Sequence, residues 1–336
     1  MASSEALRDY YIDQIRQNGY AQADFSVSRG DMLCLFDSFE EVIFDVFDSP
    51  GPQGQHIINA LSVEHHGRPL DSKGFIEQRR VGRVSIYEIG RDPSTDDKDQ
   101  MHVTPLTYGH AEDYFRGQGG MPRVLRNLLD QCVDLQAAIH KSIIPVADAL
   151  GVKDYLFAPH GMESNNVHML RLLRYLGNKK TSEHVAIQPV KPLAGYHFDR
   201  SKFTVAGILE SRSGLRGAQG NNAVGDPNLT VEEFEANAER ALYTPLPYKA
   251  GKVKLFAGAG YNHLPLTIRK TSGNLPLLGH LVEDDEPGEE RLAAVNFLNQ
   301  HTGIKELGTP LANETGYDSV RAVIAERQER YGGMVA

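Results

Sequence analysis

The sequence predicts a mostly β protein with flanking helices, in which a helical N-terminal region precedes an all-β barrel or jelly-roll core. Two observations lead to this fold class. Over the first 150 residues, apolar side chains recur at the three- and four-residue intervals of amphipathic helices. From residue 169 onward, short apolar runs alternate with Gly and Pro turns, which is typical of strands in barrels and jelly rolls.

The N-terminal region contains three predicted helices, over residues 4–18, 30–48 and 121–150. The third is the clearest, because its apolar residues stay on one face and Gly151 follows them as a stop signal. Cys132 lies on this apolar face, so we expect an inert buried thiol there.

Residues 56–105 are more polar and carry only scattered β signals. The acidic stretch 92–99 contains Pro, Ser and Thr, and we expect it to be an exposed loop. His65, His66 and His102 are interpreted as solvated loop histidines.

The β region begins where the helical period gives way to short apolar runs. The predicted strands occupy residues 169–176, 185–187, 195–209, 253–257, 264–268, 278–282 and 292–298, with a turn at 213–217. Residues 217–250 interrupt the series. Within them Thr230 and Glu233 form a capping box that predicts a helix over 231–242.

Composition narrows the possible partners. With 35 Lys and Arg against 44 Asp and Glu, the chain of 336 residues carries a net charge of −9, which disfavours nucleic acid as a partner. Two cysteines are too few for a disulfide framework. The N-terminus lacks the layout of a signal peptide, and no stretch reaches the ~18 apolar residues of a membrane span. We therefore expect a cytoplasmic protein that binds neither membrane nor nucleic acid.

The first chemical signal is His197-Phe-Asp199 at the start of an apolar β-rich run. In a strand, residues i and i+2 point to the same face, so the imidazole and the carboxylate are presented side by side. Such a pair supplies two of the three ligands of a 2-His-1-carboxylate iron site, which leaves coordination positions open. A second histidine from a later strand would complete the site, and His263 and His280 are the candidates.

The order of further motifs carries a family resemblance. Thr271-Ser-Gly273 leads into His280-Leu-Val282, and Arg291 opens a strand that ends at Asn299. Together with His197-Phe-Asp199, these segments resemble the iron(II)- and 2-oxoglutarate-dependent dioxygenases of the isopenicillin N synthase-like family, over residues 169–299. The resemblance implies a cupin-like double-stranded β-helix, and it selects His280 over His263 as the third ligand.

The resemblance also implies the cofactors and partners. Iron(II) would be held by His197, Asp199 and His280, with molecular oxygen, 2-oxoglutarate and a small-molecule substrate as its partners. The reaction would be hydroxylation, desaturation or ring closure of an amino acid or natural-product intermediate.

Two residues would bind the co-substrate. A bidentate contact from Arg291 suits the distal carboxylate of 2-oxoglutarate, and Tyr175 resembles a family position whose phenol often completes the contact. Ala293 replaces the family's serine, which predicts weaker co-substrate binding. Arg171 shares the strand face of Tyr175; a structural ion pair is favoured there over a substrate carboxylate.

The predicted domain organisation follows from these segments. Residues 1–150 form the helical N-terminal region packing on the core, residues 151–305 the oxygenase core with a lid-like insertion at 217–250, and residues 306–336 a C-terminal helix. Two alternatives stay open: an isopenicillin N synthase-like iron oxidase that works without 2-oxoglutarate, and a non-catalytic cupin-like binding protein.

Overall fold

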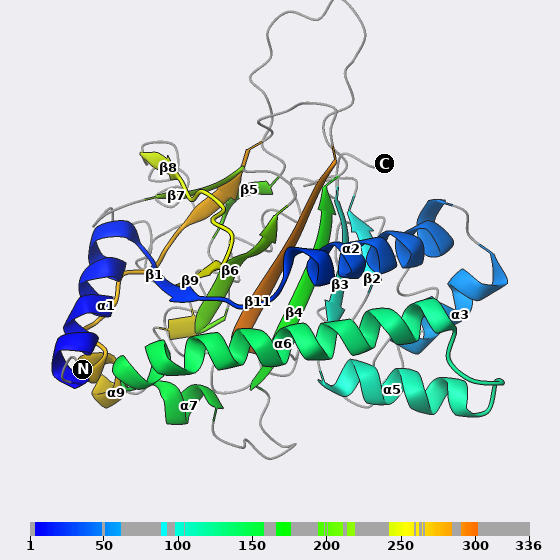
Figure 1. Cartoon of the computed structure of the whole chain (residues 1–336), viewed down its shortest axis with the longest axis horizontal. Coiled ribbons are helices and arrows are strands. Elements are labelled where there is room, and N and C mark those ends of the chain that lie inside the picture. The colour runs from blue at the N-terminus through cyan, green and yellow to red at the C-terminus, as the bar shows by residue number, and fades with distance from the viewer. Residues whose placement is uncertain are drawn as a thin grey trace, which may run out of the picture.

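A computed structural model gives the architecture of the protein. It describes residues 4–48, 51–61, 89–92, 98–103, 105–157, 166–175, 194–197, 199, 201–210, 214–218, 242–258, 260–261, 264, 266–283 and 290–301. In these residues two antiparallel sheets are accompanied by helices, most of which come from the first half of the chain (Figure 1).

The helices confirm the predictions for the N-terminal region. Their bounds are α1 Ser4–Asn18, α2 Arg29–Ile43, a π-helical turn η1 Phe44–Asp48, α3 Pro52–Leu61, α5 Pro105–Arg116, α6 Arg123–Ala149, α7 Lys153–Phe157 and α9 Leu266–Thr271. The predicted helices at 4–18 and 121–150 agree closely with α1 and α6, and the one at 30–48 corresponds to α2 and η1. Helices α3 and α5, at the two ends of the polar stretch 56–105, were not predicted from the sequence.

The larger sheet has seven strands in the order β1-β9-β6-β11-β4-β3-β2. Their bounds are β1 Ala21–Asp24, β2 Ile89–Asp92, β3 Lys98–Val103, β4 Asn166–Tyr175, β6 Phe203–Glu210, β9 Lys252–Ala257 and β11 Arg291–His301. The predicted strands at 169–176, 253–257 and 292–298 are confirmed as β4, β9 and β11. The predicted run 195–209 is two strands, β5 and β6, rather than one.

The smaller sheet has four strands in the order β5-β10-β7-β8. Its members are β5 Ala194–His197, β7 Leu215–Ala218, β8 Tyr243–Pro245 and β10 His280–Val282. The turn predicted at 213–217 was wrong, because Leu215–Ala218 pairs with both β10 and β8. Two antiparallel sheets agree with the predicted class, and their closure into a jelly roll stays a prediction.

The two faces of the larger sheet are different. On β11 the even-numbered Ala294 and Leu298 belong to the main apolar core, which also includes residues of α2 and α6, and Leu292 packs against it. The odd-numbered Arg291 and Phe297 line a cavity on the opposite face. This follows from the alternation of side chains along a strand. One face of the sheet is therefore covered by helices, and the other face lines the cavity.

Helix α6 provides the main cover. It crosses the strands of the larger sheet (Figure 1) and buries an apolar stripe that includes Leu125, Leu128 and Ile139. Each such side chain stabilises the fold by roughly 1.5–3 kcal/mol. Cys132 is buried in the same stripe, and burial raises the pKa of its thiol, which confirms the expected inert cysteine.

A buried ion pair ties β3 and β4 to the N-terminal helices. Nη2 of Arg174 donates to Oδ2 of Asp99 at 2.6 Å and to Oδ2 of Asp48 at 2.9 Å. Asp99 is 0% exposed, so the prediction of an exposed loop over 92–99 was wrong at its C-terminal end. His102 lies on β3 and is 2% exposed, so its interpretation as a solvated loop histidine was also wrong. The charge pattern of the sequence did not indicate that Asp99 and His102 are buried, because the arginines that contact them lie on β4, 75 and 69 residues farther along the chain.

The strand predicted at 264–268 is also wrong, since residues 266–271 form α9. The alternation of Leu264, Leu266 and Ile268 imitates a strand, but Leu266 is exposed. Pro265 suits the start of a helix, and Gly273 ends the turn with a φ of +81°.

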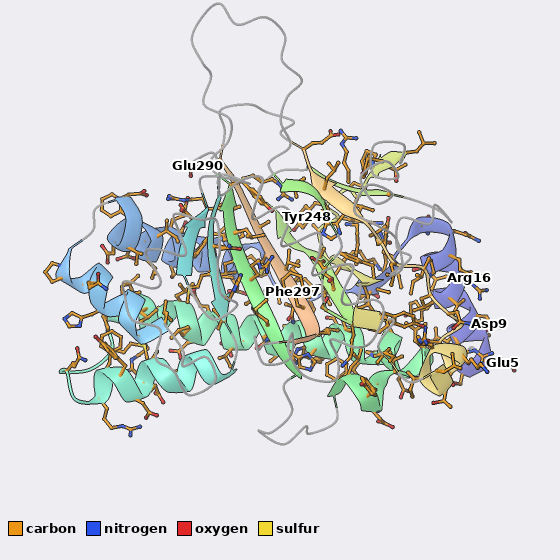
Figure 2. All side chains as sticks on the ribbon, turned by 180° about the vertical axis from the view of Figure 1, so that it is seen from behind. Glu5, Asp9, Arg16, Tyr248, Glu290 and Phe297 are labelled. Carbon is orange, nitrogen blue, oxygen red and sulfur yellow. The ribbon has the colours of Figure 1, made fainter. Side chains whose placement is uncertain are left out.

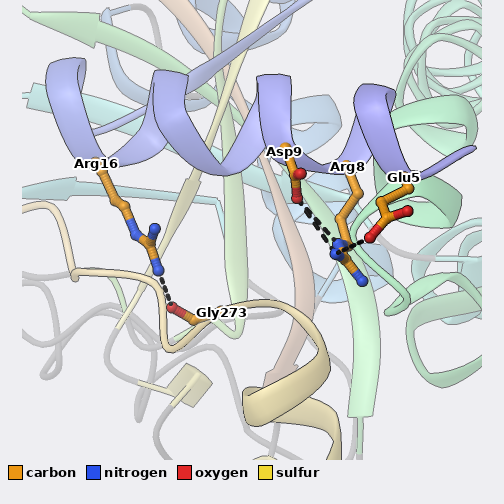
Figure 3. A network of polar contacts seen from close by, with 5 residues as sticks. All are labelled: Glu5, Arg8, Asp9, Arg16 and Gly273. Carbon is orange, nitrogen blue, oxygen red and sulfur yellow. Dashed lines mark hydrogen bonds and ion pairs between the residues drawn. The ribbon is translucent and has the colours of Figure 1, made fainter. Parts of the chain in front are cut away.

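Helix α1 is anchored to the turn that follows α9. Figure 3 shows Arg16 reaching this turn, where Nη2 donates to the carbonyl oxygen of Gly273 at 3.0 Å. About two turns toward the N-terminus, Arg8 contacts Asp9 and Glu5 within α1 itself. Glu5, Asp9 and Arg16 lie at the outer end of the molecule, away from Phe297 (Figure 2).

Several predictions lie outside the described residues: the strand 185–187, the helix 231–242, the C-terminal helix 306–336, and His65, His66 and His263. The domain bounds and the lid-like role of 217–250 stay predictions. Within the described residues, no helix is long and apolar enough to cross a membrane.

Candidate metal and co-substrate site

A cavity between the two sheets brings together most of the predicted site residues. Its lining comes from β4, β6, β9 and β11 of the larger sheet, from β7 and β10 of the smaller sheet, and from Asp199. The lining residues are Arg171, Leu173, Tyr175, Asp199, Thr204, Ala206, Leu215, Phe256, His280, Val282, Arg291, Ala293, Val295 and Phe297.

Asp199 and His280 lie next to each other in this cavity. Oδ2 of Asp199 is 3.6 Å from Nε2 of His280, and the two residues are 6% and 5% exposed. They come from segments 81 residues apart in the chain, so the fold itself creates their contact. The ring of Phe256 packs edge-on against His280 at 5.4 Å between centroids.

The main chain of His197 lies beside this pair. In the register of β5 with β10, His197 stands directly opposite His280. Strand pairing therefore brings both predicted histidines to one place in the smaller sheet. The side chain of His197 lies outside the described part of the structure, so its role as a ligand stays a prediction. Among the described side chains, no group of three His, Cys, Asp or Glu residues could hold a metal ion.

Hydrogen bonds fix the orientation of the carboxylate of Asp199. Oγ1 of Thr204 donates to Oδ2 of Asp199 at 2.7 Å, and Oγ of Ser201 lies 2.8 Å from Oγ1 of Thr204. Since the single hydroxyl proton of Thr204 is committed to Asp199, Ser201 is the donor in the second bond. Both hydroxyls are 0% exposed, so no solvent competes for the carboxylate on this side.

The backbone beneath Asp199 needs a glycine at position 258. A Cβ atom placed there would lie 2.4 Å from the carbonyl oxygen of Ser201 and 2.6 Å from that of Asp199. The backbone N–H of Gly258 also donates to the carbonyl oxygen of Lys202, at 3.2 Å. The end of β9 is therefore in direct contact with the segment that carries Asp199.

The hydrogen-bond partner of His280 identifies its tautomer. Nδ1 lies 3.4 Å from the carbonyl oxygen of Leu278, which can only accept, so Nδ1 carries the proton. In the neutral ring, Nε2 then has a lone pair that faces the carboxylate of Asp199. The distance of 3.6 Å between Oδ2 and Nε2 also suits a shared metal ion, since metal bonds of ~2.0–2.2 Å to each atom could span it. The donor set therefore fits a metal ion.

Arg291 lies in the same cavity and is 2% exposed. Its guanidinium carbon is 5.4 Å from the ring centroid of Tyr175, which stands opposite Arg291 in the register of β11 with β4. Ala293 lines the cavity two residues farther along β11 and presents only a methyl group. The structure thus brings a buried guanidinium and the predicted phenol into the cavity that contains Asp199 and His280.

Arg171 also lines the cavity, where Nε donates to Nε2 of His102 at 2.9 Å and the guanidinium carbon lies 4.5 Å from the ring centroid of Phe297. Sequence reasoning gave no site role to Thr204, Ser201, Gly258 or His102. The alternation of β6 places Thr204 on the cavity side, and that signal was available; nothing in the sequence indicated the contacts of the other three.

Comparison with known proteins supports the architecture. No protein-family model and no curated protein sequence matches this chain. A solved structure of a proposed 2OG-Fe(II) oxygenase family protein from Caulobacter crescentus is similar, with 15% sequence identity, a TM-score of 0.50, and coverage of 96% of this chain and 95% of its own. The dioxygenase for auxin oxidation from rice gives 15% identity and a TM-score of 0.49, over 88% of this chain and 78% of its own. The first of these likenesses shows that the chain shares the fold of the Caulobacter structure.

Proposed function

We propose that this protein is an iron(II)- and 2-oxoglutarate-dependent oxygenase that oxidises a small molecule with molecular oxygen. One observation carries the proposal: the facing acceptor atoms of Asp199 and His280 share a cavity with the buried guanidinium of Arg291. The shared fold with a proposed oxygenase of this class, and the motif order of residues 169–299, give it independent support.

His197, Asp199 and His280 would hold the iron. Two imidazoles and one carboxylate suit ferrous iron and leave adjacent coordination positions open, which is where iron supplies its chemistry with oxygen. Thr204 donates to Oδ2 of Asp199 and is itself held by a hydrogen bond with Ser201, so that the carboxylate keeps one orientation. The apolar residues around the cavity, among them Leu173 and Phe256, keep water away from the reacting groups.

Arg291 would bind the distal carboxylate of 2-oxoglutarate. A buried carboxylate needs a partner with fixed positive charge, and a guanidinium can donate two parallel hydrogen bonds to it. The ring of Tyr175 packs against the guanidinium and holds it in place. We further propose that the two sheets close as a jelly roll around these groups.

One observation favours a second candidate, an iron-dependent oxidation without 2-oxoglutarate. Ala293 stands where the resembling family has a serine, so one hydrogen bond to a co-substrate carboxylate is missing. The position of Arg291 in the cavity argues for the co-substrate, because a planar guanidinium can donate two parallel hydrogen bonds to a carboxylate.

An anaerobic titration separates the candidates. Iron(II) and then 2-oxoglutarate are added to the full chain, and the visible metal-to-ligand charge-transfer band is recorded. We expect the band in wild type and in the surface control Arg8→Gln, and its loss in Asp199→Ala and His280→Ala. Iron binding without a band would favour the second candidate. No iron binding in wild type would contradict the proposal and leave a non-catalytic cupin-like binding protein.

A further inference from the structure

A second arginine in the cavity has no part in the proposed chemistry so far. Arg171 and Arg291 lie on the same face of neighbouring strands but at different heights. In the register of β11 with β4, Arg291 stands opposite Tyr175 and Arg171 stands opposite Val295. Four residues of strand separate the two positions, about 14 Å along the sheet. Figure 2 labels Glu290, which precedes Arg291 at the start of β11, and Phe297 farther along the same strand, which packs on Arg171.

The two guanidinium groups also differ in burial. Arg291 is 2% exposed, whereas Arg171 is half-buried. Arg291 therefore suits the inner co-substrate, and Arg171 lies nearer to solvent, where a second molecule would enter. Asp199 and His280 line the same cavity.

The orientation of Arg171 is fixed on two sides. Its Nε–H is committed to Nε2 of His102, which is 2% exposed and must be neutral to accept this bond. The ring of Phe297 covers one face of the guanidinium. The guanidinium is always charged, and because its orientation is already fixed, the side chain loses little conformational entropy when it binds a planar carboxylate.

We propose that Arg171 binds a carboxylate of the primary substrate, and that the substrate is a small hydrophobic carboxylic acid. Apolar side chains line the cavity between Arg171 and Arg291, among them Leu173 and its partner in the strand register, Ala293, and they suit the apolar part of such an acid. This proposal rests on the proposed function, because it assigns the acid to the same cavity as iron and 2-oxoglutarate.

Calorimetry with matched pairs of probes tests the proposal. Hexanoate, phenylacetate and 3-phenylpropionate are each compared with their neutral primary amide, and phenyl phosphate is added as a second anion. The full chain is titrated without metal, and again with iron(II) and 2-oxoglutarate under anaerobic conditions. We expect at least one acid to bind 10-fold or more tighter than its amide, since a charge-assisted hydrogen bond contributes about that factor.

Variants locate the effect. Arg171→Gln should abolish the preference for acid over amide, Arg171→Lys should keep part of it, and the surface variant Arg8→Gln should behave as wild type. Thermal melting shows which variants are folded, and Arg171→Lys decides the matter if Arg171→Gln does not fold. The proposal is overturned if the preference for acid over amide survives in a folded Arg171→Gln variant, or if Arg171→Lys keeps all of it. It is also overturned if wild type shows no such preference, or if phenyl phosphate binds more tightly than every acid.

The results that would contradict the proposed oxygenase function differ from those that would contradict the carboxylate site at Arg171. A charge-transfer band without acid preference leaves the oxygenase and removes the carboxylate site. An acid preference that depends on Arg171 in the metal-free chain, with no band on adding iron(II) and 2-oxoglutarate, removes the oxygenase instead.

Discussion

The hydroxyl group of Thr204 donates a hydrogen bond of 2.7 Å to Oδ2 of Asp199, the same oxygen that faces Nε2 of His280. Thr204→Val removes this donor and keeps the shape of the side chain. We expect a 10- to 100-fold loss of iron(II) affinity, the usual effect of removing a group that orients a metal ligand. Thr204→Ser keeps the hydroxyl and should restore most of the affinity; equal binding by the Val and Ser variants would contradict the role.

Gly258 provides a second test of how Asp199 is positioned. A methyl group at this position would meet the carbonyl oxygens of Ser201 and Asp199 at 2.4 and 2.6 Å, so the backbone that carries Asp199 must shift. We expect Gly258→Ala to lower iron(II) affinity by about 10-fold or more, because ligand placement on the order of 0.5 Å decides such sites. Gly117→Ala is the matched control, since a Cβ atom there meets nothing within 4 Å. Equal losses in both variants would show a general loss of stability instead.

Co-substrate affinity should depend on Arg291 and on its neighbour Ala293. Arg291→Lys keeps the charge but loses the planar fork, and we expect 2-oxoglutarate to bind about 10-fold more weakly. Ala293→Ser adds a hydroxyl on the same strand face and should tighten binding. Titration of the charge-transfer band measures both. If the serine variant gains nothing, Ala293 does not stand beside the carboxylate.

Stability should fall in acid because of His140 on α6. Desolvation lowers the pKa of His140 to about 4, from an ordinary value near 6.5, and its ring packs against Phe157 and His168. Between pH 4 and pH 6.5, His140 is therefore mostly neutral in the folded state and mostly protonated in the unfolded state. The stability that neutral His140 confers is fully present above pH 6.5, and it falls by at most about 1.4 kcal/mol per pH unit as the pH drops toward 4.

Urea unfolding at pH 7 and at pH 5 measures this dependence. In His140→Gln, which cannot titrate, the free energy of unfolding should fall less between the two pH values than in wild type. An equal fall in both proteins would contradict the assignment to His140.

The sequence predicted the helices and strands whose apolar periodicity is long and regular, such as α6 and β4. It failed where a short pattern allowed two structures. Leu264, Leu266 and Ile268 alternate like a strand, but Pro265 and the turn at Gly273 favour α9. It failed again where a charged residue is buried by a distant partner, as Asp99 is by Arg174.

For the site, the sequence indicated that Asp199, His280, Arg291 and Tyr175 belong together, and the structure places all four along one cavity. Spacing alone left His263 and His280 as alternatives, and the order of motifs was needed to choose. The supporting contacts of Ser201 and Gly258 could not be predicted. They depend on how the end of β9 meets the segment before β6, which no local pattern encodes.

The most direct test of the account is the stoichiometry of iron(II) binding in the absence of oxygen, measured for wild type and for single alanine variants of His197, Asp199, His280 and His263. We predict one tightly bound iron per wild-type chain, its loss in the first three variants, and wild-type binding in His263→Ala. Wild-type affinity in His197→Ala or His280→Ala would contradict the claim that these side chains share one metal ion.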